Sequence, residues 1–136
     1  AFLHIELNET WVQQGGAATP ASVEINHVGR EVEKFPSGKT KAEWEGGLDE
    51  NGGYRLHGRQ VFYYESGPKQ WESEYRAGKR TGTETFWNPD GSKKWQRTFG
   101  EGDSWTWQLF ASSGAVAAES KWSGKKLVDP GKRPAR

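Results

Sequence analysis

The stretch WESEYRAGKRTGTETFWNPDGS, from Trp71 to Ser92, decides the fold of this chain. It opens with alternating aromatic and polar residues, passes through Gly78 and Gly82, and continues in the β-forming run TETFW. It ends in NPDGS, a sequence typical of a tight turn. Aromatic and polar residues that alternate in short runs, bounded by glycine and proline turn signals, predict antiparallel strands joined by hairpins.

The same pattern recurs along the chain at a regular interval. Turn glycines are spaced 29, 24 and 23 residues apart, at Gly38, Gly67, Gly91 and Gly114. The units open at intervals of 29, 24 and 24 residues, at Gly29, Gly58, Gly82 and Thr106. Two markers thus indicate one repeat. We predict an all-β fold in which four tandem β-hairpins, residues 29–128, form one elongated, curved antiparallel sheet, with LDENGGY (Leu48 to Tyr54) as a protruding loop.

The two ends of the chain differ from the repeats. The segments FLHIEL, TWVQ and SVEINHV lie upstream, and we expect residues 1–28 to form strands that cap the sheet. The last residues, 129–136, are polar and basic, and we expect them to be frayed. Because the chain begins with Ala and contains no Met, we interpret it as part of a larger, multimodular protein.

The order aromatic-x-small-x-aromatic-x-x-Gly-x-x-x-Gly stands in the chain as WESEYRAGKRTG (Trp71 to Gly82) and WQRTFGEGDSWT (Trp95 to Thr106). It resembles the MORN repeat, in particular its bacterial variant class. Ser73 and Arg97 depart from that pattern, since they stand where the family prefers Gly, and Thr106 replaces a glycine. The resemblance implies a curved sheet of stacked hairpins that serves as a binding or interaction scaffold and not as an enzyme.

Composition and charge exclude several classes of function. With 19 Lys and Arg against 18 Asp and Glu, the net charge of +1 argues against nucleic acid and against a membrane surface as partners. There is no cysteine, and the three histidines stand alone, so we predict no metal, no cofactor and no catalytic residue. The pairs Glu31 with Glu33 and Glu72 with Glu74 could serve acid–base chemistry on sugars, but a charged solvent-facing strand explains them better.

Tryptophan is the unusual component, with eight residues beside four Tyr and six Phe. Counted from each unit's opening, one predicted packing stripe consists of Glu33, Phe62, Phe86 and Phe110. The next positions, Lys34, Tyr63, Trp87 and Ala111, fall on the opposite face. We assign Tyr75 and Phe99 to the core with the three Phe. A thin sheet offers few interior places for so many rings, and we expect several indoles to be exposed.

Exposed rings in a row suit the weakly apolar faces of sugars, while polar neighbours can bind hydroxyl groups. We therefore predict a non-catalytic carbohydrate-binding module that binds a polysaccharide or oligosaccharide outside the cell or at the cell surface. The alternative is a protein–protein interaction scaffold of the MORN type, which predicts a contiguous apolar patch. The candidate binding residues are Trp71, Trp87, Trp95, Trp105, Trp107, Tyr63, Arg97 and Glu72.

Overall fold

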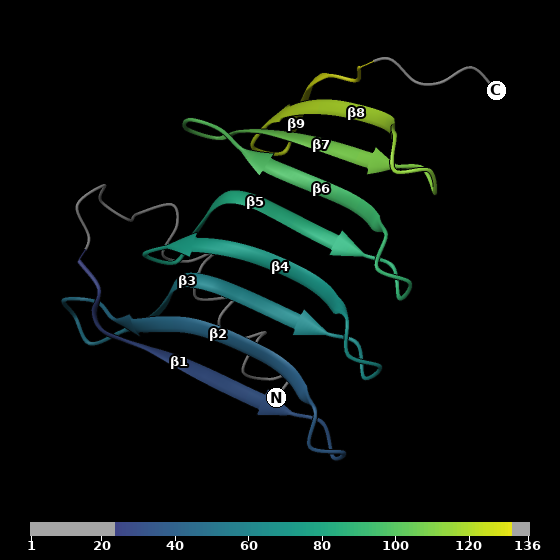
Figure 1. The fold of residues 1–136 in the computed structure, drawn as a ribbon. Helices are drawn as coiled ribbons and strands as arrows, with labels where there is room; N and C mark the ends of the chain where they lie inside the picture. Colours follow the sequence, from purple (N-terminus) through teal and green to yellow (C-terminus); the bar gives the residue numbers. More distant parts are fainter. Residues whose placement is uncertain (1–23, 132–136) are drawn as a thin grey trace.

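The fold is a single open antiparallel sheet of nine strands, seen in a computed structural model that describes residues 24–131 (Figure 1). Each strand pairs with the next along the chain, so the spatial order equals the sequence order. The described residues contain no helix that could cross a membrane. The nine-stranded antiparallel sheet confirms the predicted all-β class. The strands are β1 (Asn26–Lys34), β2 (Thr40–Leu48), β3 (Tyr54–Tyr63), β4 (Lys69–Arg76), β5 (Lys79–Trp87), β6 (Lys93–Phe99), β7 (Ser104–Phe110), β8 (Val116–Ser123) and β9 (Lys126–Asp129).

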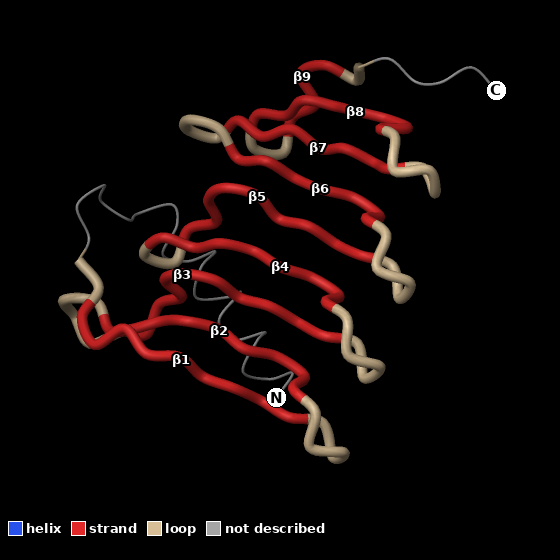
Figure 2. The backbone as a smooth tube through the Cα atoms, in the orientation of Figure 1, coloured by secondary structure: helices blue, strands red, loops and turns tan. Residues whose placement is uncertain are grey.

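Four similar turns follow β1, β3, β5 and β7, and all four lie on the same side of the sheet, at the ends of the strands (Figure 2). In each turn the glycine donates its N–H to the carbonyl three residues earlier, as Gly67 does to Tyr64 at 2.9 Å. The four glycines have positive φ angles, from 90° at Gly91 to 117° at Gly67. Glycine adopts that conformation without steric cost, so these glycines fix the hairpin register.

Both ends of the repeat array differ from the prediction. β1 begins at Asn26, three residues before the predicted boundary at Gly29. At the other end Lys126–Asp129 forms a ninth strand, which pairs with β8 through Trp122 and Leu127. Asp129, assigned above to the frayed tail, therefore ends a strand. The strands expected in residues 1–23 and the tail 132–136 lie outside the described residues.

The strand register assigns every side chain to one of two faces. One row of paired residues crosses β2 to β8 and defines the aromatic face: Ala42, Phe62, Trp71, Phe86, Trp95, Leu109 and Ala118. The row beside it defines the polar face: Glu43, Val61, Glu72, Thr85, Gln96, Gln108 and Glu119. Because side chains alternate along a strand, the two rows point to opposite sides of the sheet.

This register corrects the predicted packing stripe in the fourth hairpin. Phe110 was expected beside Phe86, but Leu109 pairs with Trp95 and takes that place on the aromatic face. Phe110 lies on the polar face, in line with Tyr63 and Trp87. The difference arises because the fourth unit has Thr106 where the other units open on Gly, and counting from Thr106 places the row one residue too late. The turn glycine is the better marker, since Gly114 lies five residues after Leu109, as Gly91 does after Phe86.

The buried core lies on the aromatic face of β2, β3 and β4. It consists of Ala42, Trp44, Leu56 and Tyr75, against which Tyr54 and Phe62 pack. Of the predicted core residues only Tyr75 is fully buried, at 4% exposure, while Phe62, Phe86, Phe99 and Phe110 are half-buried. Gly46 and Gly47 are buried next to this core, and a side chain at Gly46 would collide with the backbone of Arg55, whose oxygen lies 2.7 Å from the place of a Cβ.

The predicted loop between β2 and β3 is ordered by one buried side chain. The carboxylate of Asp49 accepts hydrogen bonds from the backbone N–H of Asn51 at 2.9 Å and of Gly53 at 2.8 Å. Its second oxygen accepts from Arg55 Nε at 2.9 Å. These bonds hold the pKa of Asp49 below its ordinary value, the Gly53 N–H contributing most. The connection is thus a fixed turn, and Leu48 and Tyr54 belong to the flanking strands.

Candidate functional site: a tryptophan patch on the aromatic face

The eight predicted binding residues divide between the two faces of the sheet. Trp71, Trp95, Trp105, Trp107 and Arg97 lie on the aromatic face. Tyr63, Glu72 and Trp87 lie on the polar face. One ligand on a flat surface therefore cannot contact all eight, so the predicted set describes two surfaces that must be considered separately.

Exposure separates the described tryptophans into two groups. Trp44 is buried in the core with 5% exposure, whereas Trp71, Trp87, Trp95, Trp105, Trp107 and Trp122 are half-buried. Within residues 24–131 no tryptophan is fully exposed. The expectation of several exposed indoles is therefore wrong for the described residues, although six rings keep part of their surface in contact with solvent.

The indole N–H groups distinguish these half-buried rings. Trp71 donates to Glu84 Oε2 at 2.9 Å, Trp105 to the carbonyl of Gly124 at 2.8 Å, and Trp122 to Ser120 Oγ at 2.9 Å. By contrast, the N–H groups of Trp87, Trp95 and Trp107 find no acceptor in the described part of the chain, and of these rings Trp95 and Trp107 share the aromatic face. A buried indole usually satisfies its N–H internally, so these two donors are available to a ligand.

Trp95 and Trp107 lie close to each other on the aromatic face. Trp107 is the register partner of Arg97, and Trp95 lies two residues before Arg97 on β6. Such diagonal neighbours on one face lie about 7 to 8 Å apart. We call Trp95, Arg97, Trp105 and Trp107 the tryptophan patch.

Arg97 is held rigidly within this patch. Its Nε and Nη2 donate to Glu84 Oε1 at 2.8 and 2.5 Å. Its guanidinium carbon lies 5.0 Å from the ring centre of Trp105 and 5.2 Å from that of Phe99. A cation between two aromatic rings is attracted to both. The rings are also braced, because Trp105 stacks on Trp122 with 5.0 Å between centroids.

Ring pairing continues along the aromatic face toward the core. Trp95 stacks on Phe86 with centroids 5.9 Å apart, and Trp71 meets Phe62 edge to face at 5.0 Å. The N–H of Trp71 already binds Glu84, whose side chain is 3% exposed. Trp71 therefore contributes mainly to packing and to the position of Glu84.

The three predicted residues on the polar face take part in charged contacts. Tyr63 donates its hydroxyl to Glu43 Oε1 at 2.5 Å. Burial and this hydrogen bond raise the pKa of Tyr63 to about 12. Glu72 pairs with Arg59 and accepts from Lys69 Nζ at 3.0 Å. Trp87 lies under Lys69, whose Nζ is 5.8 Å from the ring centre.

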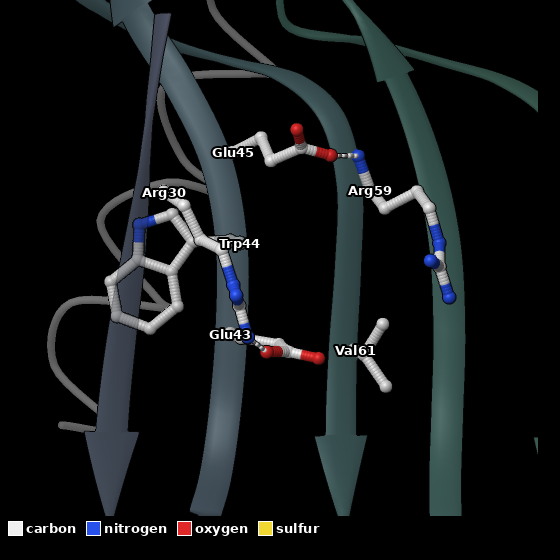
Figure 3. Close-up of a pocket in the computed structure, with 6 residues that line it drawn as sticks. All are labelled: Arg30, Glu43, Trp44, Glu45, Arg59 and Val61. Atoms are coloured by element: carbon white, nitrogen blue, oxygen red, sulfur yellow. Dashed lines mark hydrogen bonds and ion pairs between the residues drawn. The ribbon is translucent and has the colours of Figure 1, made fainter.

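A hollow of about 340 Å³ opens beside this charged group (Figure 3). Both arginines that line it are paired within the chain, Arg30 with Glu43 and Arg59 with Glu72, and Glu45 Oε1 accepts the backbone N–H of Arg59 at 3.0 Å. The hydroxyl of Tyr63 and the guanidinium of Arg30 hold the pKa of Glu43 below its ordinary value. The two cations that line the hollow are therefore already occupied by carboxylates of the chain. The lining residues are Arg30, Glu43, Trp44, Glu45, Arg59 and Val61.

The histidine His57 takes part in a hydrogen bond within the chain. His57 Nδ1 accepts the N–H of Ala77 at 2.9 Å and so stabilises the turn after β4, where Ala77 has a φ of 49°. Across residues 24–131 no group of three His, Asp or Glu side chains could hold a metal ion. His4 lies outside the described residues.

Comparison with known proteins shows no family for the chain. No protein-family profile matches it, and no curated protein matches it. Among solved structures it is similar to a DUF3836 family protein from Parabacteroides distasonis ATCC 8503, with 10% sequence identity and a TM-score of 0.25. That likeness covers 76% of this chain and 93% of the other. A TM-score this low carries no argument about function.

Proposed function

We propose that this chain is a non-catalytic carbohydrate-binding module that binds a polysaccharide through the tryptophan patch. The observation that carries the proposal is the pair Trp95 and Trp107, two partly exposed rings whose N–H groups have no acceptor in the described chain. In this proposal the rings stack on the C–H faces of pyranoses, and the two N–H groups donate to sugar hydroxyls.

The setting of the patch supports this proposal. Trp95 and Trp107 are diagonal neighbours, about 7 to 8 Å apart. At that spacing the two indoles can contact neighbouring sugar rings of one glycan. Arg97 is fixed by Glu84, so it is already ordered before a ligand arrives. Ordered side chains lower the entropic cost of binding. The module would work outside the cell or at its surface, as one part of a larger protein.

Affinity gel electrophoresis in soluble polysaccharides tests the proposal. Trp107→Ala should weaken the affinity derived from the retardation about tenfold. It removes a stacking surface of a size that contributes about 1 to 3 kcal/mol in other ring-stacking sites. Trp107→Phe should retain part of the binding, since it keeps a ring and removes only the N–H. Leu48→Ala, at an exposed residue of β2 outside the patch, serves as the control and should leave retardation unchanged.

Retardation of the Trp107→Ala protein equal to that of the parent, with circular dichroism showing an intact sheet, would remove the tryptophan patch from the proposal. No retardation of the parent chain in neutral or acidic polysaccharides would remove carbohydrate binding itself.

A protein-interaction scaffold is the second candidate, and the outer strands favour it. In the described sheet β1 and β9 each pair on one side only. All residues of β9 are exposed, with Leu127 at 44% and Val128 at 63%, and on β1 Val32 is 45% exposed. Open strands with apolar side chains can add a strand from a partner. Size-exclusion chromatography with Val128→Lys tests this, and loss of a dimer in that variant would support it.

A further inference from the structure

A regular alternation of rings and lysines crosses the polar face beside the hairpin turns. Five neighbouring strands, β3 to β7, contribute in order an aromatic ring, a lysine, a ring, a lysine and a ring. We call this set the lysine–aromatic ladder, and its members are Tyr63, Lys69, Trp87, Lys93 and Phe110.

Side-chain contacts connect the ladder. Lys69 Nζ lies 5.8 Å from the ring centre of Trp87, and Lys93 Nζ lies 5.6 Å from that of Phe110. The register pairs Tyr63 with Lys69 and Trp87 with Lys93. Both contacts and pairing repeat with the hairpin, so the ladder follows from the repeat itself. The three rings are half-buried and keep part of their surface in contact with solvent.

The two lysines differ in their charge environment. Lys69 forms an ion pair with Glu72, with 3.0 Å between Nζ and Oε1. Lys93 is exposed, and no described carboxylate lies within ion-pair distance of it. The ladder therefore presents one unpaired cation between two rings, Trp87 and Phe110.

Two neutral amides, of Gln96 and Gln108, lie in the neighbouring row of the polar face. Gln96 Nε2 donates to Thr85 Oγ1 at 3.1 Å, and Gln108 Nε2 donates to Glu119 Oε2 at 2.8 Å. These bonds orient both amides, and their carbonyl oxygens accept no hydrogen bond from described residues. Oriented amides next to rings offer acceptors for sugar hydroxyls.

We propose that the lysine–aromatic ladder is a second binding surface, which takes an acidic polysaccharide that lies across the strands with a carboxylate on Lys93. This inference rests on the proposed carbohydrate-binding function but places the acidic polymer on the polar face. Successive rings stand two strands apart, about 9.6 Å. That distance corresponds to one disaccharide of an extended β-linked chain, so one hairpin accommodates one disaccharide.

Charge favours an acidic glycan over nucleic acid. Tight binding to nucleic acid requires several phosphates to be neutralised together. The ladder has two lysines, one of them shared with Glu72, and the chain as a whole carries +1. A polymer with one carboxylate per disaccharide matches this sparse positive charge.

The experiment compares two adjacent lysines that point to opposite faces. Lys93→Gln removes the unpaired cation of the ladder, while Lys94→Gln makes the same charge change beside Phe86, on the aromatic face. Calorimetric titration uses hyaluronan, which alternates acidic and neutral sugars, and hydroxyethyl cellulose as the neutral polymer. Single-stranded DNA is titrated in parallel.

We expect Lys93→Gln to weaken hyaluronan binding about fivefold, in the range of a single exposed charge pair. The slope of log affinity against log salt should fall by about one. Trp87→Ala should weaken binding about tenfold. Lys94→Gln should leave hyaluronan affinity within about twofold, because screening at physiological salt acts over about 8 Å.

Equal losses in Lys93→Gln and Lys94→Gln, no loss in either, or DNA binding as tight as hyaluronan binding would overturn the ladder assignment. If hydroxyethyl cellulose still binds in those cases, carbohydrate binding survives and only the ladder fails. If the parent protein binds neither polysaccharide, the proposed function fails, and this inference fails with it.

Discussion

Glu84 and Arg97 are register partners on β5 and β6, and Glu84 Oε1 accepts from Arg97 Nε at 2.8 Å. The other oxygen of Glu84 accepts the indole N–H of Trp71 at 2.9 Å. Glu84 is 2% exposed, so this carboxylate is buried and connects the packed part of the aromatic face to the tryptophan patch. The fixed position of Arg97 against Trp105 depends on it.

Glu84→Gln should destabilise the fold by about 2 to 3 kcal/mol, because Arg97 then loses its charged partner in a buried setting. Urea denaturation followed by tryptophan fluorescence measures this. Glu65→Gln, an exposed turn residue, is the matched control and should change stability by less than about 0.5 kcal/mol. Equal effects of the two substitutions would show that the Glu84 network contributes little.

Gly46→Ala should destabilise the sheet by about 1 to 3 kcal/mol, the usual cost of overpacking. The added methyl group would lie 2.7 Å from the backbone oxygen of Arg55, which cannot rotate away. Gly29→Ala is the matched control, since the nearest atom to its Cβ lies 4.0 Å away. Thermal melts of the two variants should differ clearly, and similar melting temperatures would contradict the packing described for β2 and β3.

Tyr63 should make stability depend on alkaline pH. Its pKa is raised from 10.0 to about 12 by burial and by the hydrogen bond to Glu43, so the folded chain keeps the proton where the unfolded chain has lost it. The stabilising contribution is therefore complete below pH 10.0 and is lost as the pH rises toward 12. Tyr63→Phe should flatten this fall in denaturation midpoint, whereas Tyr64→Phe should leave it in place.

The local elements could be predicted from the sequence because glycine and aromatic spacing report local geometry. Gly38, Gly67, Gly91 and Gly114 occupy the same place in four turns, as their spacing indicated. Where the local marker was missing, the prediction failed. Thr106 gave no glycine to anchor the fourth unit, and the stripe was shifted from Leu109 to Phe110.

The candidate site was harder to predict, because it depends on which face a ring occupies and on what its N–H meets. Nothing in the sequence shows that the N–H of Trp71 reaches Glu84 while that of Trp107 has no acceptor in the described chain. Lys93 was missed, although a signal existed, since Lys69 and Lys93 both follow a turn glycine by two residues.

The measurement that tests the central claim most directly is a nuclear magnetic resonance titration of the indole N–H signals with a soluble polysaccharide. Trp95 and Trp107 should show fast solvent exchange in the free protein and shift on binding. Trp71 and Trp122, whose N–H groups are bonded within the chain, should change little. Unchanged Trp95 and Trp107 signals at saturating polysaccharide would contradict the account.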